Sequence, residues 1–439
     1  MKKELTYFDV YPKVVAADST ARITVKMLPA MQRFADPSAG LRVTLYPAGG
    51  NRADPKDRKA AVPLLPTPVE GGFAVDVSFG VEQEYILYIE TEDSRALGDV
   101  RLYALEADLL ARRPYRGDVH MHSYRSDGKE SPVHVAAACR RIGLDFMALT
   151  DHRLYAPSLE AIEAYRDAPI DLRIYPGEEV HAPGNPVHII NFGGSASINA
   201  LFTDQPERYQ REVEQLAAQV RGVPVGADPF AYAACAWCFD RIREAGGLGI
   251  FCHPYWFASH RYDVPEPLTD LILDRQPYDA LELIGGYHRH ELESNHLQVA
   301  RYHEMRAQGR RIPVVGVSDA HGCDTGELFG WYSTLVFSPT SDLEDLIGSI
   351  KALYSVAIDA VPEELPRAHG PFRLVKYAQF LLRDVLPLHD ALCEEEGRWM
   401  VRYAAGDPEA GRMLGLLRGR TASLYDHLWV GARSMSLLK

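Results

Sequence analysis

Side chains that can bind metal ions recur along this chain at intervals that core packing does not explain. The set consists of histidines and carboxylates: His120, His122, Asp127, His152, Glu179, His188, His253, Asp319 and His321. Imidazole and carboxylate ligands together suit zinc, manganese or iron. The pattern predicts a polynuclear metal site, and hydrolysis is the expected chemistry because bound cations activate water.

Four of the ligand-bearing stretches share one design, a short apolar run that ends in a ligand. They span residues 116–122, 146–152, 249–253 and 313–321. Runs of this length that follow helix-like segments predict buried parallel strands in βα units. Ligands at the carboxyl ends of such strands can meet in one pocket. His120 and His122 lie two residues apart, so both point to one strand face while Met121 faces away.

The ordered motifs resemble those of the polymerase and histidinol phosphatase (PHP) superfamily of metal-dependent hydrolases. The matching segments are HMHSYRSDG from His120, TDH from Thr150, GEE from Gly177, PVHII around His188, CHP from Cys252 and SDAHG from Ser318. The resemblance covers about residues 114 to 360, and the complete ordered series is far more specific than one H-x-H motif. It implies an α/β fold built on a distorted (β/α)7 barrel.

The resemblance also implies two or three divalent ions, with three as the full trinuclear site. The first ion would be held by His120, His122, Glu179 and Asp319, the second by Glu179, His188 and His253, and the third by Asp127, His152 and His321. Glu178 and Glu179 must face opposite sides of a strand, so only one can reach the ions. The G-x-E spacing favours Glu179, with Glu178 as the alternative.

The expected mechanism is attack by a hydroxide that bridges two of the ions, because shared cations lower the pKa of water toward neutrality. Asp319, His321 and Glu179 are the residues expected to take a catalytic part. Asp319 would orient the nucleophile, and an ion or a protonated histidine would assist the leaving group.

Candidates for contact with the substrate follow from position at the ends of strands. Arg153 suits an anionic group because its planar fork can donate two parallel hydrogen bonds. Tyr255 follows the CHP motif, and His288 and His290 follow the strand-like segment 280–284. Histidines outside the motifs, His181 among them, are expected to be scaffold.

Three classes of function remain open. A phosphoesterase that acts on a small phosphorylated substrate is favoured, because cations suit phosphate oxygens. A carboxyl-ester, carbamate or amide hydrolase is the alternative, since relatives with an added N-terminal β domain resemble a carbaryl-hydrolase-like branch. A non-catalytic PHP module is the third, and the complete ligand set speaks against it.

Composition predicts a cytoplasmic protein whose partner is a small anionic molecule. The formal charge of −13 over 439 residues does not favour binding to nucleic acid or to anionic membranes. The segment MKKELTYFDVYPK lacks the apolar stretch of a signal peptide, and no long apolar run predicts a membrane span. Six cysteines without regular spacing predict no disulfide framework, and Cys235 and Cys238 are expected to be buried small residues.

The chain is expected to contain three regions. Short alternating segments at 23–28, 41–46, 72–78, 85–91 and 100–105 predict an N-terminal β-sandwich over residues 1–112. The catalytic barrel is expected over 113–362, with 204–246 as a helical insertion or cap. Apolar stripes at helical spacing predict a C-terminal helical extension over 363–439 that serves as core or as a contact in a homo-oligomer.

Overall fold

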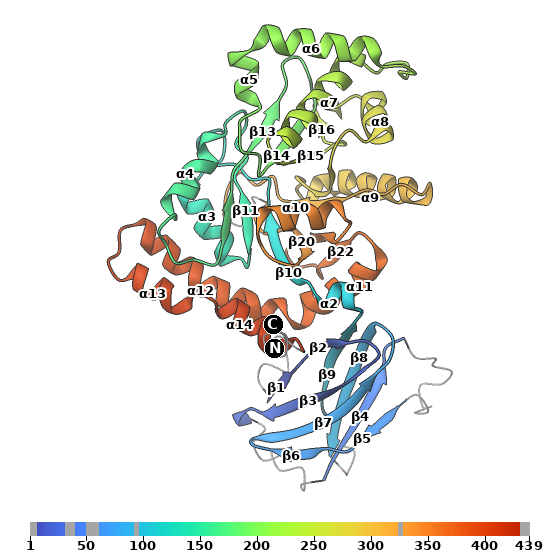
Figure 1. Cartoon of the computed structure of the whole chain (residues 1–439), viewed down its shortest axis with the longest axis vertical. Coiled ribbons are helices and arrows are strands. Elements are labelled where there is room, and N and C mark those ends of the chain that lie inside the picture. The colour runs from blue at the N-terminus through green and yellow to red at the C-terminus, as the bar shows by residue number, and fades with distance from the viewer. Residues whose placement is uncertain (1–6, 31–39, 50–60, 92–95, 324–327, 431–439) are drawn as a thin grey trace. The chain divides into compact units, whose positions relative to one another are not determined.

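The computed structural model describes residues 7–30, 40–49, 61–91, 96–323 and 328–430. It confirms the predicted mixed α/β class, with several sheets and helices (Figure 1). The chain forms two compact units, one of Met1–Arg113, Phe380–Pro387 and Gly419–Lys439 and the other of Pro114–Gln379 and Leu388–Arg418. The residues after 362 are thus shared between the units. None of the described helices is both long and apolar enough to cross a membrane.

The first unit contains two sheets that share one apolar core. One has the order β1-β3-β7-β6 and the other β2-β9-β8-β4-β5. The strands are β1 Phe8–Tyr11, β2 Val14–Ala16, β3 Ser19–Met27, β4 Leu41–Pro47, β5 Val62–Leu64, β6 Thr67–Val69, β7 Gly72–Phe79, β8 Gln83–Thr91 and β9 Ala96–Leu105. Side chains of β3 alternate between buried and exposed, as a strand with one covered face requires. The five strands predicted here coincide with β3, β4, β7, β8 and β9.

A short helix after β9 and a helix from the C-terminal part of the chain complete this first unit. Helix α2 (Ala107–Leu110) follows β9, and helix α14 is Arg420–Leu428. The carbonyl of Leu428 accepts a hydrogen bond from the N–H of Lys13 at 2.7 Å, and Val430 donates to Val14 at 2.8 Å. Strand β2 therefore pairs with β9 on one side and meets the C-terminal segment on the other.

The second unit is built on two larger sheets. Their orders are β12-β11-β10-β20-β21-β22 and β13-β14-β15-β18-β19. The strands are β10 Arg113–Asp118, β11 Phe146–Ala148, β12 Arg173–Tyr175, β13 Gly177–His181, β14 His188–Phe192, β15 Leu248–Phe251, β18 Ala280–Gly285, β19 Val314–Val317, β20 Tyr332–Ser338, β21 Ser355–Asp359 and β22 Arg367–His369, with a small hairpin of β16 Phe257–Ala258 and β17 Arg261–Tyr262.

Two isolated bridges connect these sheets. Met121 pairs with Ala320 beyond the ends of β10 and β19, and His152 pairs with Glu179 beyond the end of β11. Pairing therefore runs through β10, β11, β13, β14, β15, β18 and β19 and returns to β10. The two bridges involve predicted ligands or their direct neighbours, so the junctions of the sheets bring these segments together.

Strand β14 departs from the parallel arrangement that the sequence predicts for its neighbours. It is antiparallel to both β13 and β15, whereas β15, β18 and β19 run parallel. His188 lies at the start of β14 and pairs with His181 at the end of β13. Reversal of the strand thus places His188 at the same edge as ligands that follow the ends of the parallel strands.

Helices cover the sheets of the second unit and provide most of the remaining core (Figure 1). They are α3 Pro132–Arg141, α4 Ala156–Ala164, α5 Asn199–Asp204, α6 Pro206–Gln219, α7 Pro229–Glu244, α8 Glu266–Arg275, the 3-10 helix η4 Arg289–Glu291, α9 Leu292–Ala307, α10 Leu343–Lys351, α11 Phe372–Asp384, α12 Leu386–Ala404 and α13 Ala410–Leu417. Helix α3 begins with a sequence signal, because Ser131 accepts a hydrogen bond from the N–H of His134 and Pro132 follows it.

Candidate metal centre

The H-x-H segment directly follows β10 and is fixed by the buried carboxylate of Asp118. One oxygen of Asp118 accepts hydrogen bonds from the N–H groups of His120 at 3.2 Å and Ser318 at 3.1 Å. Burial raises the pKa of Asp118 to about 7. Met121 packs its sulfur 3.6 Å from the sulfur of Cys139, while His120 and His122 are buried at the candidate site. The alternation predicted for this segment is confirmed.

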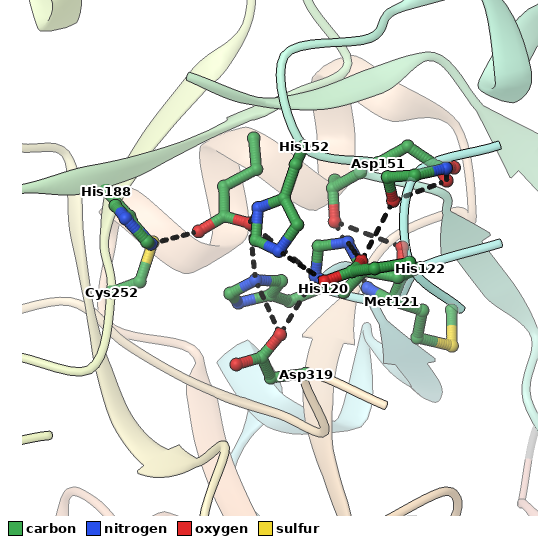
Figure 2. Close-up of polar contacts among 12 residues, drawn as sticks. His120, Met121, His122, Asp151, His152, His188, Cys252 and Asp319 are labelled. Atoms are coloured by element: carbon green, nitrogen blue, oxygen red, sulfur yellow. Dashed lines mark hydrogen bonds and ion pairs between the residues drawn. The ribbon is translucent and has the colours of Figure 1, made fainter. Parts of the chain in front are cut away.

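Glu179 lies at the centre of the candidate site, and six histidine nitrogens surround its carboxylate. Its Oε1 is 2.8 Å from His188 Nδ1 and 3.6 Å from His253 Nε2, and its Oε2 is 2.6 Å from His152 Nδ1, 3.5 Å from His122 Nε2, 3.6 Å from His120 Nε2 and 3.7 Å from His181 Nε2. The carboxylate is fully buried. Figure 2 shows several of these side chains turned toward one another.

Glu178 points to the other face of β13 and serves a different purpose. It accepts hydrogen bonds from Ser197 Oγ at 2.7 Å, Asn199 Nδ2 at 2.9 Å and Asn191 Nδ2 at 3.2 Å, and from the backbone N–H of Ile198. These bonds hold the segment that leads from β14 into α5. Of the two adjacent glutamates, the structure brings Glu179 to the histidines.

Asp319 is the second carboxylate of the buried group. Its Oδ1 is 2.9 Å from His122 Nε2 and 3.1 Å from His120 Nε2. Its backbone has a φ of 51°, a left-handed conformation that costs energy in a residue other than glycine. The N–H of Asp319 donates to the carbonyl of His120 at 2.8 Å, which holds the strained residue beside the H-x-H segment.

A third group lies around Asp127, at the more exposed side of the site. Asp127 is 3.4 Å from both His152 Nε2 and His321 Nε2, and 4.0 Å from His122 Nδ1. The ring of His321 stacks on that of His122 with centroids 4.3 Å apart. His321 Nδ1 is 2.9 Å from the carbonyl of Asp319, so Nδ1–H donates there and Nε2 is left to face Asp127.

All nine predicted ligands thus meet in one region of the second unit. Potential ligand atoms lie within 4.8 Å of one another in the groups His120–His122–Asp319, His120–Glu179–His253 and His122–Asp127–His152–His321. His120 and His122 each belong to two of these groups, whereas the resemblance places both with one ion. The convergence of the nine residues was expected, and the sharing of His120 and His122 between groups was not.

The unsatisfied atoms of this region test whether its residues fit bound cations. Within the described chain, five buried atoms here make no aligned hydrogen bond and meet other groups of the site only in ion-pair contacts: Nε2 of His120, Nδ1 of His122, Nδ1 of His188 and both oxygens of Glu179. Buried polar atoms without partners are rare and costly. Imidazole nitrogens and carboxylate oxygens are also the donor atoms that divalent transition metals prefer. The residues therefore fit a metal centre.

The electrostatics of the site agree with a demand for positive charge. Burial alone would raise the pKa of Glu179, but His120 and His152 hold it well below its ordinary value. Asp319 behaves in the same way, with His120 and His122 offsetting its burial. Burial would lower the pKa of His120, yet Asp319 and Glu179 raise it well above its ordinary value. Two buried anions thus favour protonation of the neighbouring histidines, and bound metal cations can replace these protons in balancing the negative charge.

Two residues of the site escaped the sequence interpretation. His181 was expected to be scaffold, but its Nε2 lies 2.9 Å from His152 Nδ1. Its signal was present, because it follows Glu179 by two residues on one strand, as His122 follows His120. Glu282 is fully buried on β18, with Oε2 3.2 Å from His120 Nδ1. Its signal was a lone carboxylate within the apolar strand ALELIG.

A cavity of about 250 Å³ opens onto the predicted ligands. It is lined by Asp127, His152, His188, His253, Trp256, Gly286, Asp319 and His321. Trp256 belongs to the aromatic segment that follows the CHP motif, and its ring centroid lies 5.9 Å from that of His253. Tyr255, which was predicted to contact substrate, is buried and does not line this cavity. Trp256 takes the place that the sequence interpretation gave to Tyr255.

The remaining substrate candidates lie apart from this cavity. His288 precedes η4 and His290 lies within it, and their rings stack with centroids 5.8 Å apart. Neither lines the cavity at the ligands. Arg153 lines a second and larger cavity. Cys235 and Cys238 are fully buried in α7, and burial raises the pKa of both thiols, as expected for inert packing residues.

Comparisons with known proteins give short or distant similarities. No known family model matches the sequence. A 68-residue stretch, 16% of the chain, is 37% identical to the DNA polymerase/3'-5' exonuclease PolX of Bacillus subtilis (strain 168) and covers 12% of that protein. The chain therefore spans only a small part of this curated relative.

Solved structures with partial similarity include a two-domain protein from Bacteroides vulgatus ATCC 8482, described as containing a predicted PHP-like metal-dependent phosphoesterase. It is 17% identical with a TM-score of 0.38, over 56% of this chain and 65% of that one. An amidohydrolase from Chromobacterium violaceum with bound sulfate and no metal is 21% identical with a TM-score of 0.31, over 49% of this chain and 89% of that one. Similarities this distant do not assign a function, so the function is inferred from the arrangement of the side chains.

Proposed function

We propose that this protein is a metal-dependent hydrolase of the PHP type that acts on a small phosphorylated substrate. One observation carries the proposal: nine histidines and carboxylates from distant parts of the chain converge, and five of their buried atoms make no hydrogen bond within the described residues. A protein that needed these residues only for packing would leave several costly unsatisfied groups in its interior. Bound cations would satisfy them.

We propose the ligand sets implied by the sequence motifs. They are His120, His122, Glu179 and Asp319 for one ion, Glu179, His188 and His253 for a second, and Asp127, His152 and His321 for a third. When bound, such ions lower the pKa of water toward neutrality and offset negative charge that develops on the substrate. Zinc, manganese and iron all suit these ligands.

The residues of the chain provide position and an apolar wall. Asp319 approaches the histidines through Oδ1, which leaves Oδ2 available to accept a proton from a nucleophilic water. Trp256 provides one apolar wall of the 250 Å³ cavity. His321 is fixed by the carbonyl of Asp319, so Nε2 faces the cavity in a defined orientation. Glu179 contributes both oxygens to the centre.

A phosphate ester is the substrate best suited to this cavity, because its histidine and carboxylate walls would hold several cations and a phosphoryl group needs several cationic contacts. A carboxyl ester, carbamate or amide is the second candidate, and Trp256 favours it because an aromatic wall suits a less polar substrate. A non-catalytic role leaves the unsatisfied atoms without a purpose.

The architecture we propose around this site has three parts. The circuit of strands in the second unit corresponds to a distorted (β/α)7 barrel over residues 113–362, with 204–246 as a cap that contains α6 and α7. The paired sheets of the first unit correspond to a β-sandwich over 1–112, and residues 363–439 to a helical extension. The substrate is a small anionic molecule, and self-association through the added regions is compatible with this arrangement.

The test is a substrate screen on purified protein loaded with zinc, manganese or iron. Phosphate monoesters and diesters are compared with carboxyl esters, carbamates and amides. We expect turnover of phosphate esters that is lost in His120→Ala and Asp319→Ala, while circular dichroism shows both variants folded. Turnover of carbonyl substrates alone would favour the second candidate. Full activity in either variant would refute the assignment of the site.

A further inference from the structure

A second cavity lies beside the candidate metal centre and shares one wall with it. Its volume is about 520 Å³, roughly twice that of the cavity at the ligands. His188 lines both cavities, so the two cavities adjoin at this side chain. The larger cavity also includes Arg153, His181, Phe202 and Thr203 in its walls. The position of the two cavities raises the question of which part of a substrate each would hold.

Arg153 is held at this cavity in an unusual backbone conformation. Its φ of 61° lies in the left-handed region, which costs a residue with a side chain about 1 kcal/mol or more. Its N–H donates to the carbonyl of Glu179 at 2.9 Å, so the strained residue is fixed to the strand that carries the central carboxylate. Strain of this kind persists where the surrounding structure requires the side chain in one place.

The guanidinium of Arg153 has no ion pair or hydrogen bond to any residue that the structure describes, although the chain carries a net charge of −13. Arg125, close by in the sequence, pairs with Glu160 at 2.9 Å. An unpaired arginine in the wall of a cavity can bind an anionic group in two parallel hydrogen bonds.

The two asparagines of this cavity already make hydrogen bonds within the protein. Asn185 donates to the carbonyl of Ala231 and accepts from the N–H of Val187. Asn199 donates to Glu178 and to the carbonyl of Glu179. Arg153 is therefore the charged group left to recognise a ligand, and the ring of Phe202 offers an apolar surface beside it.

Arg153 lines the larger cavity and not the smaller one. It is thus misplaced to hold the group that is hydrolysed, and well placed to hold another part of the same molecule. We propose that the 520 Å³ cavity is a substrate subsite, in which Arg153 binds a second anionic group, a carboxylate or a phosphate, on the part of the substrate that is not hydrolysed. The inference rests on the proposed function, because it takes the metal centre as the reacting site.

Binding of non-hydrolysable phosphonates tests this subsite separately from turnover. The probes are ω-carboxyalkylphosphonates of increasing chain length, each matched with an ω-hydroxyalkylphosphonate of equal length. Their Kd values are measured by calorimetry on the metal-loaded full chain, for wild type, Arg153→Ala and the matched control Arg125→Ala. Arg125 is another exposed arginine near the site, but it does not line the cavity.

We expect the carboxylate to tighten binding by about tenfold at one favoured chain length in wild type and Arg125→Ala, as one charge-assisted pair at a partly exposed site provides. The preference should disappear in Arg153→Ala and return in part in Arg153→Lys. Absence of a carboxylate preference at every length, or its retention in Arg153→Ala, would overturn the subsite.

Kinetics on the corresponding phosphate esters separate this inference from the proposed function. If no ester is hydrolysed but the carboxylate preference depends on Arg153, the subsite stands and the assigned reaction is wrong. If esters are hydrolysed with equal kcat/KM for carboxyl and hydroxyl forms, the reaction stands and the subsite is wrong.

Discussion

The second unit contains two buried clusters of histidine and carboxylate residues. Potential ligand atoms lack hydrogen bonds in one cluster, whereas hydrogen bonds join the side chains of the other. The metal centre has histidines around Glu179 and Asp319. The other cluster, called the Asp145 cluster, consists of Asp145, Arg140, His389, Cys393 and Glu396. Asp145, His389 and Cys393 also have ligand atoms within 4.8 Å of one another. Residue types alone would mark both clusters as candidates for a metal ion.

Partners distinguish the two clusters. Asp145 lies 2.9 Å from His389 Nε2 and accepts from Arg140 at 3.2 Å and from the N–H of Arg116 at 3.0 Å. Arg140 also donates to Glu396 at 2.8 Å. The guanidinium of Arg140 pairs with both carboxylates of this cluster, whereas the ion-pair neighbours of Glu179 are all histidines. Histidine nitrogens and carboxylate oxygens that lack hydrogen bonds, more than the residue types present, identify the site that needs a cation.

The largest expected effect is the loss of metal from Glu179→Gln. The amide keeps the volume of the side chain, but it removes the charge that six histidine nitrogens approach. We expect bound metal to fall to at most one ion per chain, held by Asp127, His152 and His321, and turnover to disappear, because the loss of a ligand exceeds the losses of about 10- to 100-fold typical of outer partners. Elemental analysis after gel filtration measures this. Wild-type metal content in the variant would show that Glu179 is not the central ligand.

His389→Ala should give the reverse pattern. It leaves the carboxylate of Asp145 with one buried partner fewer, and breaking a buried ion pair costs about 3 kcal/mol or more. We expect a lower free energy of unfolding in urea and an unchanged metal content per folded chain. Loss of metal without loss of stability would assign a cation to the Asp145 cluster instead.

A smaller effect is expected from Glu282→Gln, with Glu178→Gln as the matched control. Both glutamates are fully buried on strands of one sheet, but only Glu282 contacts a candidate ligand, His120. A carboxylate that holds the second nitrogen of a ligating histidine contributes about 10- to 100-fold to metal affinity. We expect weaker metal binding in Glu282→Gln, and lower stability with unchanged affinity in Glu178→Gln. Competition with a chromophoric chelator measures both affinities. Equal affinities in the two variants would remove Glu282 from a positioning role.

The smallest expected effect is a pH dependence of opposite sign in the two clusters. The pKa of His120 is raised well above 6.5 in the metal-free fold. Protonated His120 therefore contributes its full stabilisation, through its contacts with Asp319 and Glu179, below pH 6.5. They are lost as the pH rises through the raised pKa, and metal affinity should increase over the same range because a proton no longer competes.

Burial alone would raise the pKa of Asp145, but His389 and Arg140 hold it below 3.8. Its contribution to stability is therefore complete above pH 3.8 and is lost on further acidification.

Calorimetric metal titrations in buffers with different ionisation enthalpies should show proton release near neutral pH. Metal binding without proton release would contradict the charge state inferred for His120.

The sequence predicted the strands and the convergence of ligands well, because both leave local signals. Alternation of apolar residues identified β3, β4, β7, β8 and β9, and ligands at the ends of apolar runs identified the candidate site. The segment 204–246, predicted as a helical insertion or cap, contains α6 and α7.

Features that depend on contacts between distant segments were not predictable in the same way. The reversal of β14 leaves no mark in its own sequence, and the sharing of His120 and His122 between ligand groups depends on the approach of Asp127 and His253. Tyr255 was chosen over Trp256 because position after a motif does not tell which side chain turns toward a cavity. His181 and Glu282 each had a local sequence feature, but its meaning could be recognised only after the structure had placed Glu179 and His120 beside them.

The most direct test of the metal centre is a crystal structure of the metal-loaded protein with anomalous scattering recorded at the metal edge. The structure predicts two or three anomalous peaks in contact with Glu179, His120, His188 and Asp127 and no peak at the Asp145 cluster. Peaks only at Asp145, His389 and Cys393, or no peak in contact with Glu179, would contradict the account.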